Sequence, residues 1–327
     1  MRKRRDITGF TLLELLAAVT ITLLLAGLML AVTTATLNLW RRTQDNFTTA
    51  AQAKLALDLL ERDLQAGLFR PDGLNTWLAV DVINSSSALS SHGWLTAGLM
   101  KPAAGESQRL VPPVAAGVAP AISDARFGLS GAWLRFIAAT AESSSEPALP
   151  RALAYQIARR PVSGGVSGSN PADVRYSLFR SAVSSQTTFS NGYDVTAGAY
   201  GTALTNPGTG NDILATNVVD FAVWLYLRDA GTGALRRIFP ADNDDLAHAA
   251  RDAGSAADSN RYPDAADIML RVLTDEGARI LDAMERSGST VGRPAAYASD
   301  AEWWWAVVEV NSRVFVRRIE LRGGSPR

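Results

Sequence analysis

One carboxylate, Glu14, lies at the start of a long apolar run, five residues after Gly9. From Leu15 to Trp40 the chain carries 26 consecutive residues without a formal charge. An ionised carboxylate in hydrocarbon is unfavourable by several kcal/mol unless another group neutralises it. A new α-amino group, made by cutting the chain before Phe10, would neutralise Glu14 of a neighbouring copy. The spacing therefore predicts a charge pair between chains inside a membrane.

A second group of acids could bind a metal ion. Asp242, Asp244 and Asp245 lie close together, and Asp252 and Asp258 follow them. Calcium takes about six to eight oxygen ligands, which such a loop could supply. The spacing lacks the glycine and the terminal glutamate of an EF-hand loop. Two interpretations stay open, a calcium site and a solvated acidic loop. The second is favoured, and no other cofactor is expected.

The sequence lacks the common catalytic motifs. It has no cysteine, which excludes disulfides, thiolate metal sites and cysteine nucleophiles. The two histidines, His92 and His248, have no HExxH or paired-histidine spacing. No Gly-x-Ser-x-Gly motif is present either. The formal net charge is zero, so nothing indicates a nucleic-acid partner. We expect a protein that is not an enzyme.

Three consecutive tryptophans, Trp303, Trp304 and Trp305, raise the question of a binding surface. On a strand, successive side chains point to opposite faces, so the three could not share one core. Tryptophan is enriched among the residues that anchor protein interfaces. Two alternatives for the tryptophans stay equally open. They form a protein interface, or they are buried on both faces of a covered strand.

The uncharged run is long enough to cross a membrane as a helix, which takes about 20 residues. Residues 2–5 are all basic, and this favours a cytoplasmic N-terminus with most of the chain on the other side. A secretory signal has a shorter apolar region, followed by a small-residue cleavage site. Here the apolar stretch is longer and no break follows it. A plain signal anchor is the alternative, and it leaves Glu14 unexplained.

The N-terminal residues resemble the class III signal of type IV pilins and type II secretion pseudopilins. The resemblance rests on a short basic leader, Gly9, Phe10, Glu14 and the apolar run. It implies that prepilin peptidase cuts after Gly9, that Phe10 becomes an N-methylated N-terminus, and that Glu14 guides assembly. Many major pilins have a proline in the middle of this helix, where this chain has Ala31. The resemblance is therefore better to pseudopilins or minor subunits.

Within that family the chain is similar to two groups, the J-type minor pseudopilins and the Verru_Chthon cassette protein C group. The similarity rests on the helical segment 57–64 (LDLLERDL), the Val-Asp-Phe strand at 219–221, and Tyr262-Pro263 before an apolar strand. These features do not separate the two groups.

The sequence predicts an α+β fold, which the resemblance makes pilin-like: one long helix packed on a mostly antiparallel sheet with irregular loops. No proline precedes Pro71, so one helix can run from Phe10 to about Leu68. Its second half is amphipathic, with leucines on one side and charged residues, Asp58, Glu61 and Asp63 among them, on the remaining surface. Strands are expected at 132–138, 152–158, 174–180, 218–228, 235–239, 268–272 and 313–321, and a short helix at 274–284.

These expectations divide the chain into a leader (1–9), a membrane-spanning part of the helix (10–40), an amphipathic part (41–70) and a β-rich domain (71–327). The resemblance implies an inner-membrane, single-pass subunit whose globular domain is periplasmic or extracellular. Expected partners are prepilin peptidase, other pseudopilin or minor pilin subunits, the membrane and a secreted substrate. The alternative is a signal-anchored periplasmic binding or scaffold protein that enters no fibre.

Overall fold

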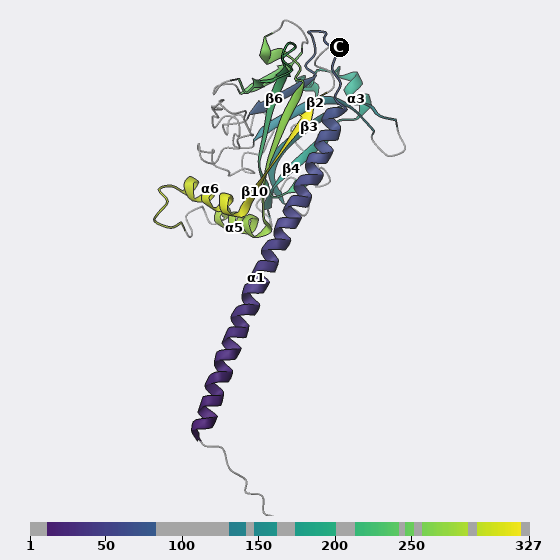
Figure 1. Ribbon diagram of the computed structural model, residues 1–327. Coiled ribbons are helices and arrows are strands. Elements are labelled where there is room, and N and C mark those ends of the chain that lie inside the picture. Colours follow the sequence, from purple (N-terminus) through teal and green to yellow (C-terminus); the bar gives the residue numbers. More distant parts are fainter. Residues whose placement is uncertain are drawn as a thin grey trace, which may run out of the picture. The chain divides into compact units, whose positions relative to one another are not determined.

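A computed structural model describes most of the chain. The described residues are 12–82, 131–141, 147–161, 174–200, 213–241, 246–251, 257–286 and 293–321. The chain divides into two compact units, Met1–Thr48 and Thr49–Arg327. Helix α1 (Leu12–Gln65) contributes to both (Figure 1).

In the first unit, the described residues form the N-terminal part of α1. Its stretch Leu12–Leu37 is 26 residues long, apolar and free of contacts that bury it, and by length and composition it could cross a membrane. Threonine hydroxyls along this stretch donate to backbone carbonyls three or four residues earlier. The donors are Thr20, Thr22, Thr33, Thr34 and Thr36. Such bonds satisfy the hydroxyl groups without any need for water.

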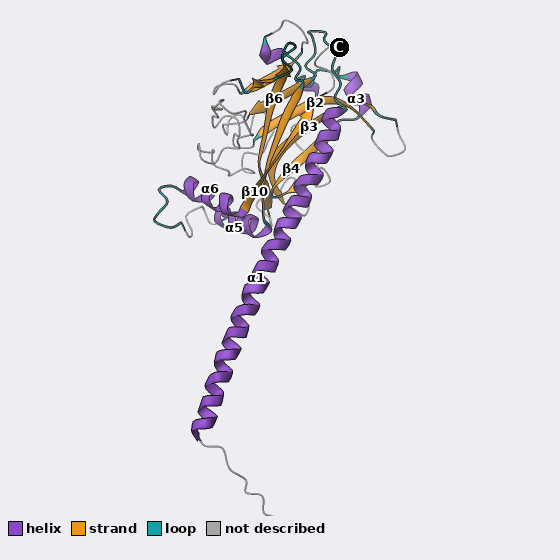
Figure 2. Cartoon of the chain, in the orientation of Figure 1, coloured by secondary structure: helices purple, strands orange, loops and turns teal. Residues whose placement is uncertain are grey.

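The second unit is built mainly from strands, which are orange in Figure 2. The strands are β1 (Leu78–Val82), β2 (Ala132–Thr140), β3 (Leu149–Pro161), β4 (Val174–Ala182), β5 (Ile213–Thr216), β6 (Val218–Arg228), β7 (Leu235–Phe239), β8 (Ala247–Ala250), β9 (Ala265–Leu273) and β10 (Ser312–Glu320). Its helices, besides α1, are α3 (Ser185–Ser190), α5 (Asp275–Arg286) and α6 (Asp300–Asn311), with 3-10 turns η4 (Gly198–Tyr200) and η6 (Asp258–Asn260).

The strands form two sheets rather than the single sheet expected from the sequence. One sheet has the order β5-β4-β3-β2-β1-β8 and the other the order β10-β9-β6-β7. All pairings between these strands are antiparallel. The α+β prediction is therefore confirmed, and the architecture agrees with a pilin-like fold. A single hydrophobic cluster joins residues of α1 with residues of both sheets.

The strongest sequence patterns gave accurate elements. The expected strand 218–228 is β6, and the expected hairpin to 235–239 is the β6–β7 pair. Gly233 has φ of 70°, a left-handed conformation that glycine adopts without strain. The expected helix 274–284 is α5, and Thr274 does cap it, because its side chain accepts from the N–H of Gly277.

Helix α1 ends three residues before the predicted position. At Gly67 the chain leaves the helix and pairs with β2: Leu68 N–H donates to the Ile137 carbonyl at 2.8 Å. Any side chain at Gly67 would start 2.8 Å from the Leu64 carbonyl oxygen. The end of α1 is therefore set by pairing with a distant strand as well as by the proline that follows.

The tryptophan run lies on a helix, not on a strand. Ser299 is the N-cap of α6, and its side chain accepts from the N–H of Glu302. The carboxylate of Glu302 accepts in turn from the N–H of Ala298 at 2.8 Å. This reciprocal arrangement is a capping box shifted by one residue, and it starts a helix at Asp300. The expectation that the three tryptophans lie on a strand is therefore wrong, since they lie on α6.

Candidate functional site

Glu14 is the candidate assembly residue that the structure describes. It lies in the first turn of α1 and is exposed. A carboxylate is favourable in the first turn because the helix N-terminus carries a partial positive charge. Gly9 and Phe10, the expected cleavage and methylation residues, lie outside the described residues. The structure thus places an acid near the start of the membrane-length helix.

The C-terminal part of α1 is held to the six-stranded sheet by a buried carboxylate, Asp63. Its Oδ2 accepts from Tyr155 Oη and from Arg180 Nε, both at 2.6 Å. Asp63 is completely buried, which corrects its assignment to the helix surface. Burial, and then the neighbouring Asp63 charge, raise the pKa of the Tyr155 phenol well above its ordinary value. Tyr155 is therefore a hydrogen-bond donor, and Asp63 is balanced by the Arg180 charge.

A second link joins α1 to the four-stranded sheet. Arg317 on β10 donates to Asp58 and, at 2.9 Å, to Glu61 on α1. The hydrogen bond to Asp58 and the charges of both acids hold the pKa of Arg317 above its ordinary value. Asp58 and Glu61 lie one turn apart on the helix, so one guanidinium can reach both. Together with Asp63, these residues attach α1 to both sheets.

The three tryptophans contribute mainly to packing inside the second unit. Trp304 and Trp305 are buried, and Trp303 is half-buried against Tyr297, with ring centroids 4.9 Å apart. Trp304 Nε1 donates to Glu285 on α5 at 3.1 Å. Two of the three side chains are thus part of the core that joins α6 to the sheets.

Glu285 is the centre of a buried polar cluster that was not anticipated from the sequence. It accepts from Arg159 Nε on β3 and from Tyr176 Oη on β4, both at 2.6 Å, besides Trp304. Asp282, one turn earlier on α5, lies 3.7 Å from Arg159. The only signal in the sequence is that Glu285 follows the apolar stripe of an amphipathic helix, which does not identify its partners.

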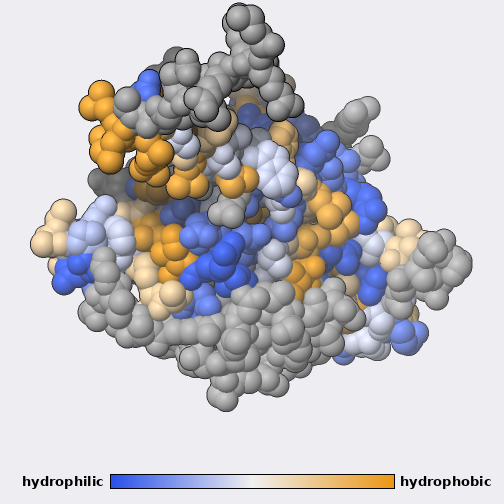
Figure 3. Space-filling view, turned by 90° about the horizontal axis from the view of Figure 1, so that it is seen from below, coloured by the Kyte–Doolittle hydropathy of each residue, from blue (hydrophilic) through white to orange (hydrophobic). Residues whose placement is uncertain are grey.

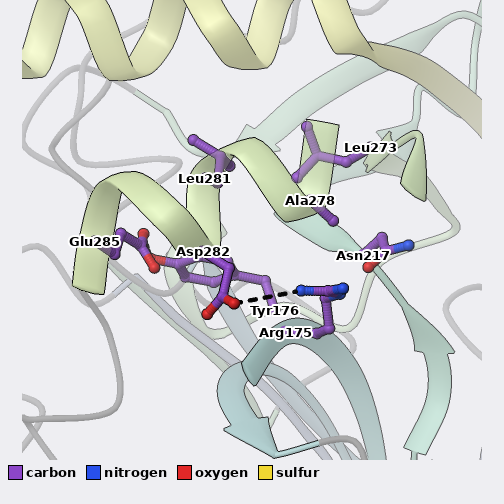
Figure 4. Close-up of a pocket in the computed structure, with 8 residues that line it drawn as sticks. All are labelled: Arg175, Tyr176, Asn217, Leu273, Ala278, Leu281, Asp282 and Glu285. Atoms are coloured by element: carbon purple, nitrogen blue, oxygen red, sulfur yellow. Dashed lines mark hydrogen bonds and ion pairs between the residues drawn. The ribbon is translucent and has the colours of Figure 1, made fainter. Parts of the chain in front are cut away.

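A small hollow lies between α5 and β4, next to this cluster. In Figure 4, Asp282 extends from α5 toward Arg175 on β4, and their charged atoms are 3.9 Å apart. Asn217 also borders the hollow, with a left-handed φ of 62°. The space in which the centre of a water molecule can lie is about 10 Å³, which is room for about one water molecule. This hollow is too small to bind a substrate.

The structure offers no support for a metal site in the part that it describes. Among the described residues, no group of three or more His, Cys, Asp or Glu could hold a metal ion. Asp242, Asp244, Asp245 and Asp252 lie outside the described residues. Asp258 is described, and it is paired with Arg236 through two hydrogen bonds. That acid is therefore engaged within the fold.

Of the two histidines, His92 lies outside the described residues and His248 is a core residue. His248 Nε2 lies 2.9 Å from the Arg261 carbonyl oxygen. Burial lowers the pKa of His248 to about 4. The neutral ring therefore donates through Nε2 and is covered on one side by Phe239, at 5.9 Å between ring centroids. Nothing in this arrangement indicates a catalytic base.

The fold and the N-terminal helix together define the class of protein. A membrane-length apolar helix precedes an antiparallel β-rich unit, which is consistent with a membrane-anchored protein of pilin-like fold. Residues 4–30 match the family model of the prokaryotic N-terminal methylation motif, which is the signature of type IV pilins and pseudopilins. No curated protein and no solved structure matches the chain. The chain thus carries the N-terminal motif of a pilin- or pseudopilin-type subunit.

This class consists of structural subunits rather than enzymes. The motif implies processing by prepilin peptidase and association with other pilin-type subunits. Figure 3 shows one face of the molecule, on which apolar and polar residues form separate, interspersed patches.

Proposed function

We propose that this chain is a minor, pseudopilin-like subunit that assembles into a type II secretion pseudopilus or a type IV pilus-like fibre. In this proposal residues 1–9 are the leader, 10–40 span the inner membrane, 41–70 continue the helix and 71–327 form the extracytoplasmic domain. Basic residues 2–5 keep the N-terminus in the cytoplasm. The domain contacts sibling subunits or a secreted substrate.

The proposed assembly step is electrostatic. Prepilin peptidase removes the leader after Gly9, and Phe10 becomes a methylated, positively charged N-terminus. The Glu14 carboxylate of one subunit then neutralises the Phe10 amine of its neighbour, while the apolar helices pack side by side. The Glu14 carboxylate and the Phe10 amine are each unfavourable in hydrocarbon unless they are paired. Their pairing therefore fixes the axial offset between neighbouring helices.

The observation that carries the proposal is the methylation motif at residues 4–30, which includes most of the apolar stretch Leu12–Leu37. Basic leader, Gly9, Phe10, Glu14 and apolar run occur together and in the order that the processing chemistry needs. A signal anchor needs only the basic residues and the apolar run.

Mass spectrometry of the mature N-terminus tests the processing step. We expect a chain that begins with methylated Phe10 when prepilin peptidase is present. A Gly9→Val variant should keep its leader, because a branched side chain replaces the glycine at the cut. A wild-type chain that begins at Met1 and functions normally would show a signal-anchored scaffold instead.

Assembly is tested with Glu14→Gln and the charge-preserving control Glu14→Asp. The glutamine variant should be cleaved and methylated but incorporated into fibres at least about tenfold less, since the subunit loses its ionic partner. Glu14→Asp should retain most incorporation. Equal fibre incorporation by the glutamine variant would contradict the proposal, even if the leader is removed normally.

A further inference from the structure

The hollow between α5 and β4 has the size of a site for one small molecule. The centre of a water molecule has about 10 Å³ to occupy there, which is room for about one molecule. Six of the eight residues that line the hollow are buried. The other two, Arg175 and Asp282, have side chains that are 12% exposed. A ligand of several heavy atoms does not fit between them.

One lining residue, Asn217, has a buried oxygen to which no group in the described part of the chain donates a hydrogen bond. Asn217 is the single residue between β5 and β6, and it is 4% exposed. Its Nδ2 donates to Asp275 Oδ1 at 2.7 Å. Because an ionised carboxylate only accepts, this bond determines which terminal atom of Asn217 is the oxygen. Asn217 Oδ1 has no partner within the chain, and a buried acceptor left in that state is destabilising.

The spacing of charges around Asp282 is a second, independent observation. Its carboxylate oxygens lie 3.9 Å from Arg175 Nη1 on β4 and 3.7 Å from Arg159 Nη2 on β3. An N–H···O hydrogen bond is about 2.7–3.2 Å long, so both separations exceed a direct bond. Polar groups at such a distance are often bridged by a water molecule. Figure 4 shows the Asp282 carboxylate directed toward the Arg175 guanidinium, next to Asn217.

The groups around the hollow select a neutral ligand that both donates and accepts. Asn217 Oδ1 and the Asp282 carboxylate are acceptors, whereas the Arg175 guanidinium is a donor. Arg175 would repel a cation, and Asp282 would repel an anion. Water is neutral, has one heavy atom, and can donate to two groups while it accepts from a third. The chemistry and the size of the hollow therefore agree on the same ligand.

We propose that the hollow is a binding site for one ordered water molecule, which donates to Asn217 Oδ1 and Asp282 and accepts from Arg175. These residues belong to the β5–β6 junction, to α5 and to β4. One water molecule thus connects α5 with the six-stranded sheet and with the residue that joins the two sheets. A water-mediated hydrogen bond is nearly as favourable as a direct one. The site does not depend on leader removal or on fibre assembly.

A crystal structure of the full chain, purified in detergent, tests the site directly. At a resolution that shows ordered waters, we expect a density peak within about 2.7–3.2 Å of Asn217 Oδ1. Asp282 or Arg175 should lie at a similar distance from the same peak. A well-ordered hollow without this peak would overturn the proposal. Direct hydrogen bonding between Arg175 and Asp282 in its place would do the same.

Two variants at Ala278, which lines the hollow from α5, test the water molecule in solution. Ala278→Ser introduces a hydroxyl that replaces the water and donates to Asn217 Oδ1. Ala278→Cys is the matched control of similar shape and helix propensity, but its thiol is only a weak donor. Oxygen-17 relaxation dispersion of the full chain in detergent counts long-lived water molecules. Both variants should hold one fewer than wild type, and an unchanged count in both would refute the site.

The unfolding equilibrium distinguishes a water that satisfies Asn217 from one that only fills space. In urea, Ala278→Ser should keep the unfolding equilibrium constant within about threefold of wild type, because its hydroxyl supplies the hydrogen bond that the water made. Ala278→Cys should raise this constant at least about tenfold, because Asn217 Oδ1 is then buried without a good donor. Equal effects of serine and cysteine would show that the water does not serve as the donor to Asn217, and the proposed role would be wrong.

Discussion

Individual buried charges decide how firmly α1 is attached to the sheets. Asp63 is enclosed completely and shared between Tyr155 and Arg180, whereas Asp58 is about half exposed beside Arg317. Breaking a buried ion pair leaves an uncompensated charge, while an exposed pair is screened by water. The two aspartates are one and a half turns apart on the same helix, and they should differ strongly in their contribution to stability.

Asp63→Asn should lower the free energy of unfolding by about 3 kcal/mol, because Arg180 then has no counter-charge. Asp58→Asn is the matched control and should cost less than about 1 kcal/mol. Urea unfolding of the full chain in detergent, followed by tryptophan fluorescence, measures both. Similar losses for the two variants would show that burial of Asp63 is not what makes it important.

Because His248 is buried in its neutral form, we expect the folded chain to lose stability in mild acid. Its folded pKa of about 4 lies below the ordinary value of 6.5, so the unfolded chain binds the proton more readily between these two pH values. The contribution of His248 is complete above pH 6.5 and decreases as the pH falls toward 4. The nearby Asp258 charge and the Arg261 carbonyl oppose this shift, and burial outweighs them.

Replacing His248 with glutamine should remove this part of the pH dependence. The difference in unfolding free energy between wild type and variant should change by up to about 3 kcal/mol between pH 7 and pH 4. Comparing the two chains cancels the titration of carboxylates that both share. A constant difference over this range would mean that the ring is not kept neutral by burial.

At the scale of elements, the contact between α5 and α6 depends on a glycine. A side chain at Gly277 would begin 2.4 Å from Asn311 Cβ and 3.2 Å from its carbonyl oxygen. Alanine favours a helix over glycine by about 1 kcal/mol, so an unobstructed glycine would be stabilised by replacement. The close approach of α6 reverses that expectation.

Gly277→Ala should therefore destabilise the fold by about 1–2 kcal/mol despite its better helix propensity. The double variant Gly277→Ala with Asn311→Gly removes the closest contact and should recover part of the loss. A double-mutant cycle from thermal or urea unfolding measures the coupling. Additive effects would show that the two helices are not in steric contact at this point.

At the scale of the whole molecule, assembly and folding should be separable. Glu14 belongs to the first unit, while the sheets and their core belong to the second. Glu14→Gln should leave the free energy of unfolding of the β-rich unit within about 0.5 kcal/mol of wild type. Urea unfolding in detergent checks this. A large loss would mean that any assembly defect of the variant reflects misfolding.

Much of the fold is predictable because its signals are local. The apolar alternation of β6, the Asp-Gly-rich turn before β7 and the proline-free stretch before Pro71 each depend on a few neighbouring residues. The capping box of α6 is also local, but three tryptophans in sequence masked it. In so short an apolar run, the helical repeat of 3.6 residues cannot be distinguished from the strand repeat of 2 residues.

Sequence alone determined the features that act along the chain: the membrane-length helix, the methylation motif with Gly9, Phe10 and Glu14, and most strands. Only the tertiary structure decided the division into two sheets and the burial of Asp63. The partners of Asp63 are 92 and 117 residues away along the chain. Local patterns indicate which face of an element is apolar, whereas the packing of distant elements decides which charged residue is enclosed with them.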